Sequence, residues 1–244
     1  MDKQAFFASL RARGSGVFGT SLTQGQVDGC EAILAACDGL PVSHAAYILA
    51  TAYHETARTM QPVRETLADT DDKAIARLEK AFAAGRLKSV KTPYWRKDAD
   101  GKSWLGRGYV QLTHRTNYAR AGLELALDLI GNPALAMQPT VAALILVRGS
   151  AEGWFTGKKL SDYLPGDYVG ARRIINGTDR AQDIAGYARA FEAALVAAEW
   201  GTSAKIAQVA ASIPAYPVTK PPSLWADIIN AINAIIAIWK GLRK

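Results

Sequence analysis

Two glutamates ten residues apart are the side chains whose type and spacing could do chemistry in this sequence. Glu55 follows His54 near the end of an alanine-rich helical pattern, and Glu65 comes after a proline. Paired carboxylates can act as general acid and general base on a glycosidic bond. Ten residues of continuous helix would separate them by about 15 Å, which is too far for joint work on one bond.

Pro62 removes that difficulty, because it disfavours helical geometry at Gln61 and lets the chain turn back across the helix end. The two carboxylates could then face one cleft at the roughly 6.5–9.5 Å expected of an inverting glycosidase. A zinc protease is the alternative for a His-Glu pair, but its motif needs a second histidine where this chain has Arg58. An ordinary solvated glutamate is the other alternative, and the second carboxylate argues against it.

A third motif, Gly106-Arg107-Gly108, leads into Gln111 and Thr113. The two glycines permit unusual backbone angles and close approach. Alternation over 109–113 predicts a short strand that presents Gln111 and Thr113 on one side, where amide and hydroxyl groups suit a sugar or an attacking water. The alternative is a loop held by side-chain to backbone hydrogen bonds.

The elements that must position these residues are helical. The chain has 244 residues and is 49% hydrophobic, so it can bury a core. Alanine-rich stretches of helical period predict helices near residues 3–11, 24–37, 42–58, 71–84, 117–130, 140–152, 167–175 and 179–199, with Asp71 and Asp179 as N-caps. Residues 87–113 are aromatic, charged and glycine-rich, which indicates a binding region. We therefore expect a mainly α fold with a small irregular or short-strand region lining a cleft.

Cysteine usage and charge bear on compartment and partners. Cys30 and Cys37 lie in one predicted helix, about 10 Å apart, and cannot pair there. The first residues lack the long apolar run of a signal peptide, so we expect synthesis in a bacterial host cytoplasm and action at the cell wall, in the periplasm, after release. The net charge of +7 suits a polyanionic partner, but only +3 lies before residue 201, so we expect no nucleic acid.

The motifs together resemble glycoside hydrolase family 19, the plant and bacterial chitinases and related phage endolysins. The resemblance rests on Glu55 after His54, on Gly106-Arg107-Gly108 before Gln111-Leu112-Thr113 and Asn117-Tyr118, and on Ile174-Ile175-Asn176-Gly177. It spans about residues 45–191 and implies a lysozyme-like catalytic domain over 1–202.

The resemblance also implies a role for each matching residue. Glu55 would be the general acid, Glu65 the general base, and Thr113 a holder of the nucleophilic water. Such a site needs neither a metal nor an organic cofactor, and we expect a monomer. The implied substrate-binding residues are His54, Gln111, Asn117, Tyr118 and Asn176.

The chain departs from the chitinase pattern in ways that bear on its substrate. It has Arg115-Thr116-Asn117-Tyr118 where chitinases have Asn-Tyr-Asn-Tyr, and Arg180 is the nearest candidate for the arginine that links the two carboxylates in many chitinases. We therefore expect a phage-type endolysin, a lysozyme that cuts the β-1,4 bonds of peptidoglycan. The alternative is a chitinase acting on polymers of N-acetylglucosamine.

The sequence pattern of the C-terminal part predicts a proline-rich linker, residues 203–222, followed by an amphipathic cationic helix, residues 223–244. This helix either docks on the domain or binds an anionic membrane surface; its apolar run is too short to span a membrane. A third function class is therefore a membrane-active antibacterial protein that acts through this helix. The residues expected at the membrane are Trp225, Ile232, Trp239, Lys240, Arg243 and Lys244.

We predict that truncation after Pro222 leaves hydrolysis of isolated peptidoglycan intact but weakens binding to anionic vesicles, because each lost basic residue near a charged surface contributes about 1 kcal/mol. Vesicle co-sedimentation at rising salt, beside a melting curve, makes the measurement. A truncated protein that melts well below the intact one, with neither form binding vesicles, would show instead that the segment is part of the fold.

Overall fold

The computed structural model describes residues 1–201. The expected linker and C-terminal helix, with all six residues predicted at the membrane, lie outside this part of the chain. Within it, no helix is long and apolar enough to cross a bilayer. The described α-helices are α1 (Lys3–Arg11), α2 (Gln24–Ala36), α3 (Val42–Glu55), α4 (Asp71–Ala83), α5 (Arg115–Leu125), α6 (Pro139–Glu152) and α7 (Ala181–Ala197). The mainly α fold is confirmed.

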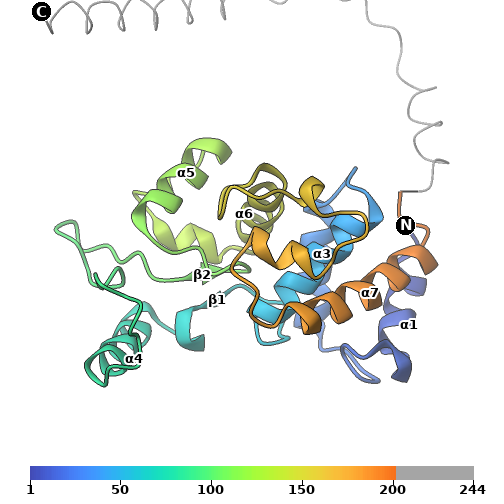
Figure 1. The fold of residues 1–244 in the computed structure, drawn as a ribbon, viewed down its shortest axis with the longest axis horizontal. Helices are drawn as coiled ribbons and strands as arrows, with labels where there is room; N and C mark the ends of the chain where they lie inside the picture. The colour runs from blue at the N-terminus through green and yellow to red at the C-terminus, as the bar shows by residue number, and fades with distance from the viewer. Residues whose placement is uncertain (202–244) are drawn as a thin grey trace, which may run out of the picture. The chain divides into compact units, whose positions relative to one another are not determined.

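Helix α3 is the centre of the main core. Every residue from Ala45 to Tyr53 is buried, so the helix is apolar all round. Helix α7 packs along α3, α1 packs on α7, and α2 packs on α6 (Figure 1). Alanines at the contacts, among them Ala46 and Ala185, let these helices approach closely, and the C-terminal end of α3 delivers Glu55 to the edge of the core.

A second, smaller core lies apart from the first. Helix α4 and the long loop after it, residues 66–105, form what we call the α4 lobe, which extends away from α3 and α7 beyond the strand pair (Figure 1). Its interior contains Trp95 and Leu105, both fully buried, packed with Leu78. The glycine-rich stretch expected to bind ligands therefore has an apolar centre of its own.

The two-stranded sheet joins the lobe to the body. Strand β1 (Val63–Arg64) runs antiparallel to β2 (Arg107–Gly108), with Arg64 directly opposite Arg107. The strand expected over 109–113 is wrong. Gln111 has a left-handed backbone (φ 54°), and Leu112 turns back to bond Arg107 through both backbone groups, so the segment is a tight turn.

Several predicted element boundaries also need correction. Helix α3 ends at Glu55, three residues early, because Ala57 and Arg58 turn left-handed and Arg58 N–H bonds the Tyr53 carbonyl. The helix expected over 167–175 is a 3₁₀ helix, Gly170–Ile174, and the one expected over 117–130 is α5, ending at Leu125. Thr70, rather than Asp71, caps α4, and Arg180, rather than Asp179, precedes α7 as its N-cap.

Helix α2 holds the loop that runs from Glu55 towards Glu65. Its Gly29 faces the Met60 carbonyl so closely that a Cβ built there would lie 1.6 Å from the oxygen. One turn earlier, the Gly25 carbonyl accepts from Gln61 Nε2 at 2.6 Å, and Gln26 Nε2 donates to the Arg58 carbonyl at 3.0 Å. The path of residues 56–62 therefore depends on a glycine in a helix where alanine would otherwise be preferred. Cys30, in the middle of this helix, and Cys37, its C-cap, are buried and do not pair, as expected.

We predict that Gly29→Ala destabilises the protein by roughly 1–3 kcal/mol, because overpacking forces the loop off the helix. Gly186→Ala is the matched control: Gly186 is a glycine of α7 with open space around it, and this change should stabilise by roughly 0.5–1 kcal/mol through helix propensity. Urea unfolding of both variants makes the comparison. Equal gains in stability would show that α2 does not constrain the loop.

Candidate active site

Glu55 forms an ion pair at the end of α3. Its Oε1 accepts a hydrogen bond from Arg172 Nη1 at 2.7 Å, and the two side chains are 18% and 4% exposed. The same guanidinium donates through Nε to the Asp179 carbonyl at 3.1 Å. Arg172 is thus fixed at both ends of its guanidinium, and it holds Glu55 at the rim of the main core.

The arginine that contacts Glu55 differs from the one expected from the sequence. Arg180 pairs with Asp183 on the surface at 2.7 Å, and Arg172, which the sequence analysis overlooked, contacts the glutamate. Arg172 and Arg173 are the two charged residues between Val169 and Ile174, and a charge in this otherwise apolar stretch is the one local signal of burial.

His54 lies beside Glu55 and is half-buried. Burial lowers the pKa of His54, partly opposed by the nearby Glu55 charge, so the ring is neutral at neutral pH. It borders a shallow hollow of about 210 Å³. The other lining residues are Tyr53, Ala57, Arg58, Arg180 and Tyr187.

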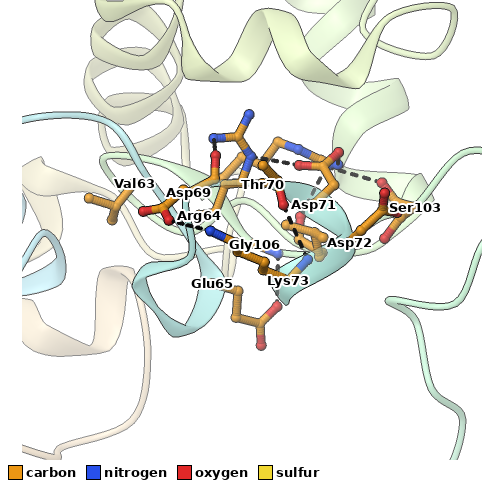
Figure 2. Close-up of polar contacts among 12 residues, drawn as sticks. Val63, Arg64, Glu65, Asp69, Thr70, Asp71, Asp72, Lys73, Ser103 and Gly106 are labelled. Atoms are coloured by element: carbon orange, nitrogen blue, oxygen red, sulfur yellow. Dashed lines mark hydrogen bonds and ion pairs between the residues drawn. The ribbon is translucent and has the colours of Figure 1, made fainter. Parts of the chain in front are cut away.

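Glu65 directly follows β1 and contacts the residue before β2. Its backbone N–H donates to the Gly106 carbonyl at 2.7 Å, and its Oε2 accepts from Gly106 N–H at 2.8 Å; Figure 2 shows the two residues on adjacent segments. Oε1 accepts from the Tyr94 hydroxyl at 2.7 Å. Both carboxylate oxygens are therefore held by donors, while lone pairs remain on each for a further contact.

Tyr94 is a site residue that the sequence analysis placed in a binding region but did not single out. Burial, followed by the hydrogen bond to Glu65, raises the pKa of Tyr94 well above its usual value. The phenol therefore stays protonated and donates a hydrogen bond to Glu65. Its ring packs on His114 with centroids 4.4 Å apart. The α4 lobe thereby supplies a donor to Glu65.

Gln111 and Thr113 lie in the turn after β2, and Gln111 lies beside Gly106, the residue that contacts Glu65. Gln111 Nε2 donates to the Val63 carbonyl at 2.9 Å and ties the turn to β1. Its Oε1 would lie 2.9 Å from a Cβ on Gly106, so a larger residue there would push the Gln111 amide aside. Thr113 is half-buried, and its carbonyl accepts from Asn117 Nδ2 at 2.9 Å.

The remaining predicted binding residues lie in different settings. Asn117 is half-buried at the start of α5. Tyr118 is fully buried, with its hydroxyl donating to the Leu105 carbonyl at 2.8 Å, so its ring lines no surface. Asn176 is exposed, and its backbone N–H donates to the Arg172 carbonyl at 3.1 Å, which places it beside the partner of Glu55.

The site residues thus form two groups, one around each carboxylate. Glu65 gathers Tyr94, Gly106 and Gln111, whereas Glu55 has Arg172 and His54. Within residues 1–201, no three His, Cys, Asp or Glu side chains are arranged to hold a metal ion. One carboxylate paired with a cation and another held by neutral donors is an arrangement suited to acid–base chemistry.

Left-handed backbone is concentrated around these groups. Ten residues other than glycine have a positive φ in the described chain, and seven of them lie in the segments that carry the two groups. Such conformations cost of order 1–3 kcal/mol each and recur at functional sites. The seven are Ala57, Arg58, Met60, Thr66, Leu67, Gln111 and His114.

Comparisons with known proteins point to one family. The model of the class I chitinases matches residues 46–159, which contain both glutamates. Chitinase 11 of Oryza sativa subsp. japonica is 34% identical over 113 residues, covering 34% of this chain and 43% of that protein. An endochitinase of Arabidopsis thaliana is 35% identical over 97 residues, covering 39% and 32%.

The chain thus spans less than half the length of the curated relatives it matches. Among solved structures, a chitinase C mutant matches with a TM-score of 0.46 and 19% identity, covering 81% of this chain and 92% of that one.

Proposed function

Because residues 46–159 belong to the class I chitinases, glycoside hydrolase family 19, we propose that this protein is a glycosidase that hydrolyses the β-1,4 bonds of bacterial peptidoglycan, as phage-type endolysins do. The observation that carries the proposal is the pair of glutamates, each held by its own set of donors at the edge of the strand pair and of α3. The bond concerned joins N-acetylmuramic acid to N-acetylglucosamine.

In the proposed mechanism Glu55 is the general acid. It protonates the leaving glycosidic oxygen through Oε2, because Oε1 is the oxygen that Arg172 holds. Arg172 then remains beside the glutamate and stabilises the carboxylate that the reaction leaves behind.

Glu65 is the proposed general base. It deprotonates a water on the opposite face of the sugar, and inversion at the anomeric carbon follows. The donors Tyr94 and Gly106 fix the direction of its lone pairs, and Thr113, in the adjacent turn, helps hold the water. The reaction needs no redox step, so two carboxylates with one water suffice.

A chitinase is the second candidate. It is favoured by the curated relatives, which are named as chitinases, and the same two glutamates would serve. Peptidoglycan is favoured by the net charge of +7, because the wall is acidic and chitin is neutral, and by the departure from the chitinase motif that begins at Arg115.

We predict that the protein releases reducing sugars from purified peptidoglycan faster than from chitin, and that Glu55→Gln abolishes the release while leaving folding and glycan binding nearly unchanged, because the amide keeps the shape but has no proton to give. Chromatography of the products identifies the bond cut. Faster release from chitin would make the chitinase the better assignment. Release of sugar from neither substrate would rule out the proposed hydrolase activity. Killing of cells by the Glu55→Gln protein would point to action through the C-terminal segment.

We predict that Glu65→Gln likewise loses hydrolysis, and that added azide restores part of it, because a small anionic base can enter the space left by the lost charge. The same azide concentrations with Glu55→Gln are the control, since azide cannot donate the missing proton. Full activity of Glu65→Gln would mean that another carboxylate is the base.

A further inference from the structure

A single carboxylate, that of Asp71, joins the two strands that flank Glu65. Its Oδ1 accepts from Arg64 Nε at 2.7 Å (Figure 2), and its Oδ2 accepts from Arg107 Nη2 at 2.5 Å. Arg64 belongs to β1 and Arg107 to β2. Asp71 itself is the first residue of α4, so one side chain connects three elements.

The strands need this connection because their own pairing is weak. Each has two residues, and the register places Arg64 directly opposite Arg107. Like charges directly opposite one another in an antiparallel pair repel. Asp71 forms an ion pair with each of the two guanidinium groups and thereby compensates their repulsion.

The arginines also connect Asp71 to the proposed base. Arg64 directly precedes Glu65, and Arg107 directly follows Gly106, the residue whose N–H holds the Glu65 carboxylate. Any slip of β1 against β2 therefore moves Glu65 relative to its donor. Arg64 Nη1 also donates to the Asp69 carbonyl at 2.9 Å, which ties the chain after Glu65 to the start of α4.

Arg107 cannot easily move to accommodate a change at Asp71. Its guanidinium is fully buried, and Nη1 donates to the Ser103 carbonyl at 3.0 Å and to the Tyr118 hydroxyl at 2.9 Å. Asp71 is the acidic side chain that the structure pairs with it. Although burial opposes the ionised form, the hydrogen bonds from Arg107 and Arg64 outweigh it and lower the pKa of Asp71, so the bridge is charged at neutral pH.

We infer that Asp71 is a positioning residue for the reaction: by bridging Arg64 and Arg107 it holds the strand pair in the register that aligns Glu65 with Gly106. It acts through the two arginines that it bridges. The inference rests on the proposed function in assigning Glu65 as the base, but the alignment itself can be measured without any turnover.

The test compares Asp71→Asn with Asp72→Asn. Asp72 is the next residue, is exposed and pairs with one exposed lysine, Lys97. In the full-length protein, the amide resonance of Gly106 reports its hydrogen bond to Glu65. We expect this resonance to shift in Asp71→Asn and to stay in place in Asp72→Asn. A resonance that stays in place in both variants overturns the inference.

Kinetics on peptidoglycan distinguish positioning from general loss of structure. We expect kcat of Asp71→Asn to fall roughly 10- to 100-fold, as for a displaced catalytic group, with little change in KM. Azide should not rescue it, because Glu65 is still present. Rescue by azide would indicate that Asp71 itself is the base. An unchanged kcat would show that Asp71 has no positioning role. If the wild-type protein hydrolyses no glycan, the proposed function fails, while the Gly106 resonance still decides the alignment.

A second variant keeps the test decisive if Asp71→Asn does not fold. Arg64→Gln leaves the Asp71–Arg107 pair in place and removes one arm of the bridge, so we expect a smaller shift of the Gly106 resonance and a smaller loss of kcat. When Arg64→Gln is combined with Asp71→Asn, it should restore part of the folded population, because it removes one of the two positive charges that face each other across the strand pair. No shift in Arg64→Gln, with no restoration in the double variant, contradicts the inference.

Discussion

The buried charge of Arg107 is the constraint on which the strand pair and the start of α4 depend. A guanidinium taken out of water must have its donors satisfied and its charge compensated. Arg107 meets this need at Nη1 and Nη2, whereas its buried Nε has no hydrogen-bond partner. The loop before β2, helix α5 and the first turn of α4 therefore converge on one side chain. The partners are the Ser103 and Leu105 carbonyls, the Tyr118 hydroxyl and the Asp71 carboxylate.

The parts of this structure that sequence reasoning predicts are those with local signals. Helix α1 begins and ends where its period indicates, and α4 differs from expectation by one residue, because caps and apolar spacing act over one or two turns. The segment after β2 was predicted as a strand from its alternation. It forms a turn instead because Gln111 bonds the Val63 carbonyl, 48 residues away, and no pattern within the segment encodes that contact.

The candidate site shows the same division. Glu55 and Glu65 stand out by type, spacing and the intervening Pro62, all of which are local. Arg172 does not stand out, since it meets Glu55 across 117 residues of chain and sits in a stretch whose period indicates an ordinary helix. Long-range ion pairs of this kind are set by tertiary packing, which brings the 3₁₀ helix Gly170–Ile174 to the end of α3.

The separate core of the α4 lobe has a consequence for how the protein loses its structure. Cooperative units with few buried apolar contacts open at a lower free energy than the whole domain. The cluster around Trp95, Leu78 and Leu105 is such a unit, and it carries Tyr94, the donor to Glu65. Glu55 belongs instead to the large core around α3. We therefore expect partial opening of the lobe to separate Glu65 from Tyr94 while Glu55 stays in place, so that thermal inactivation precedes global melting.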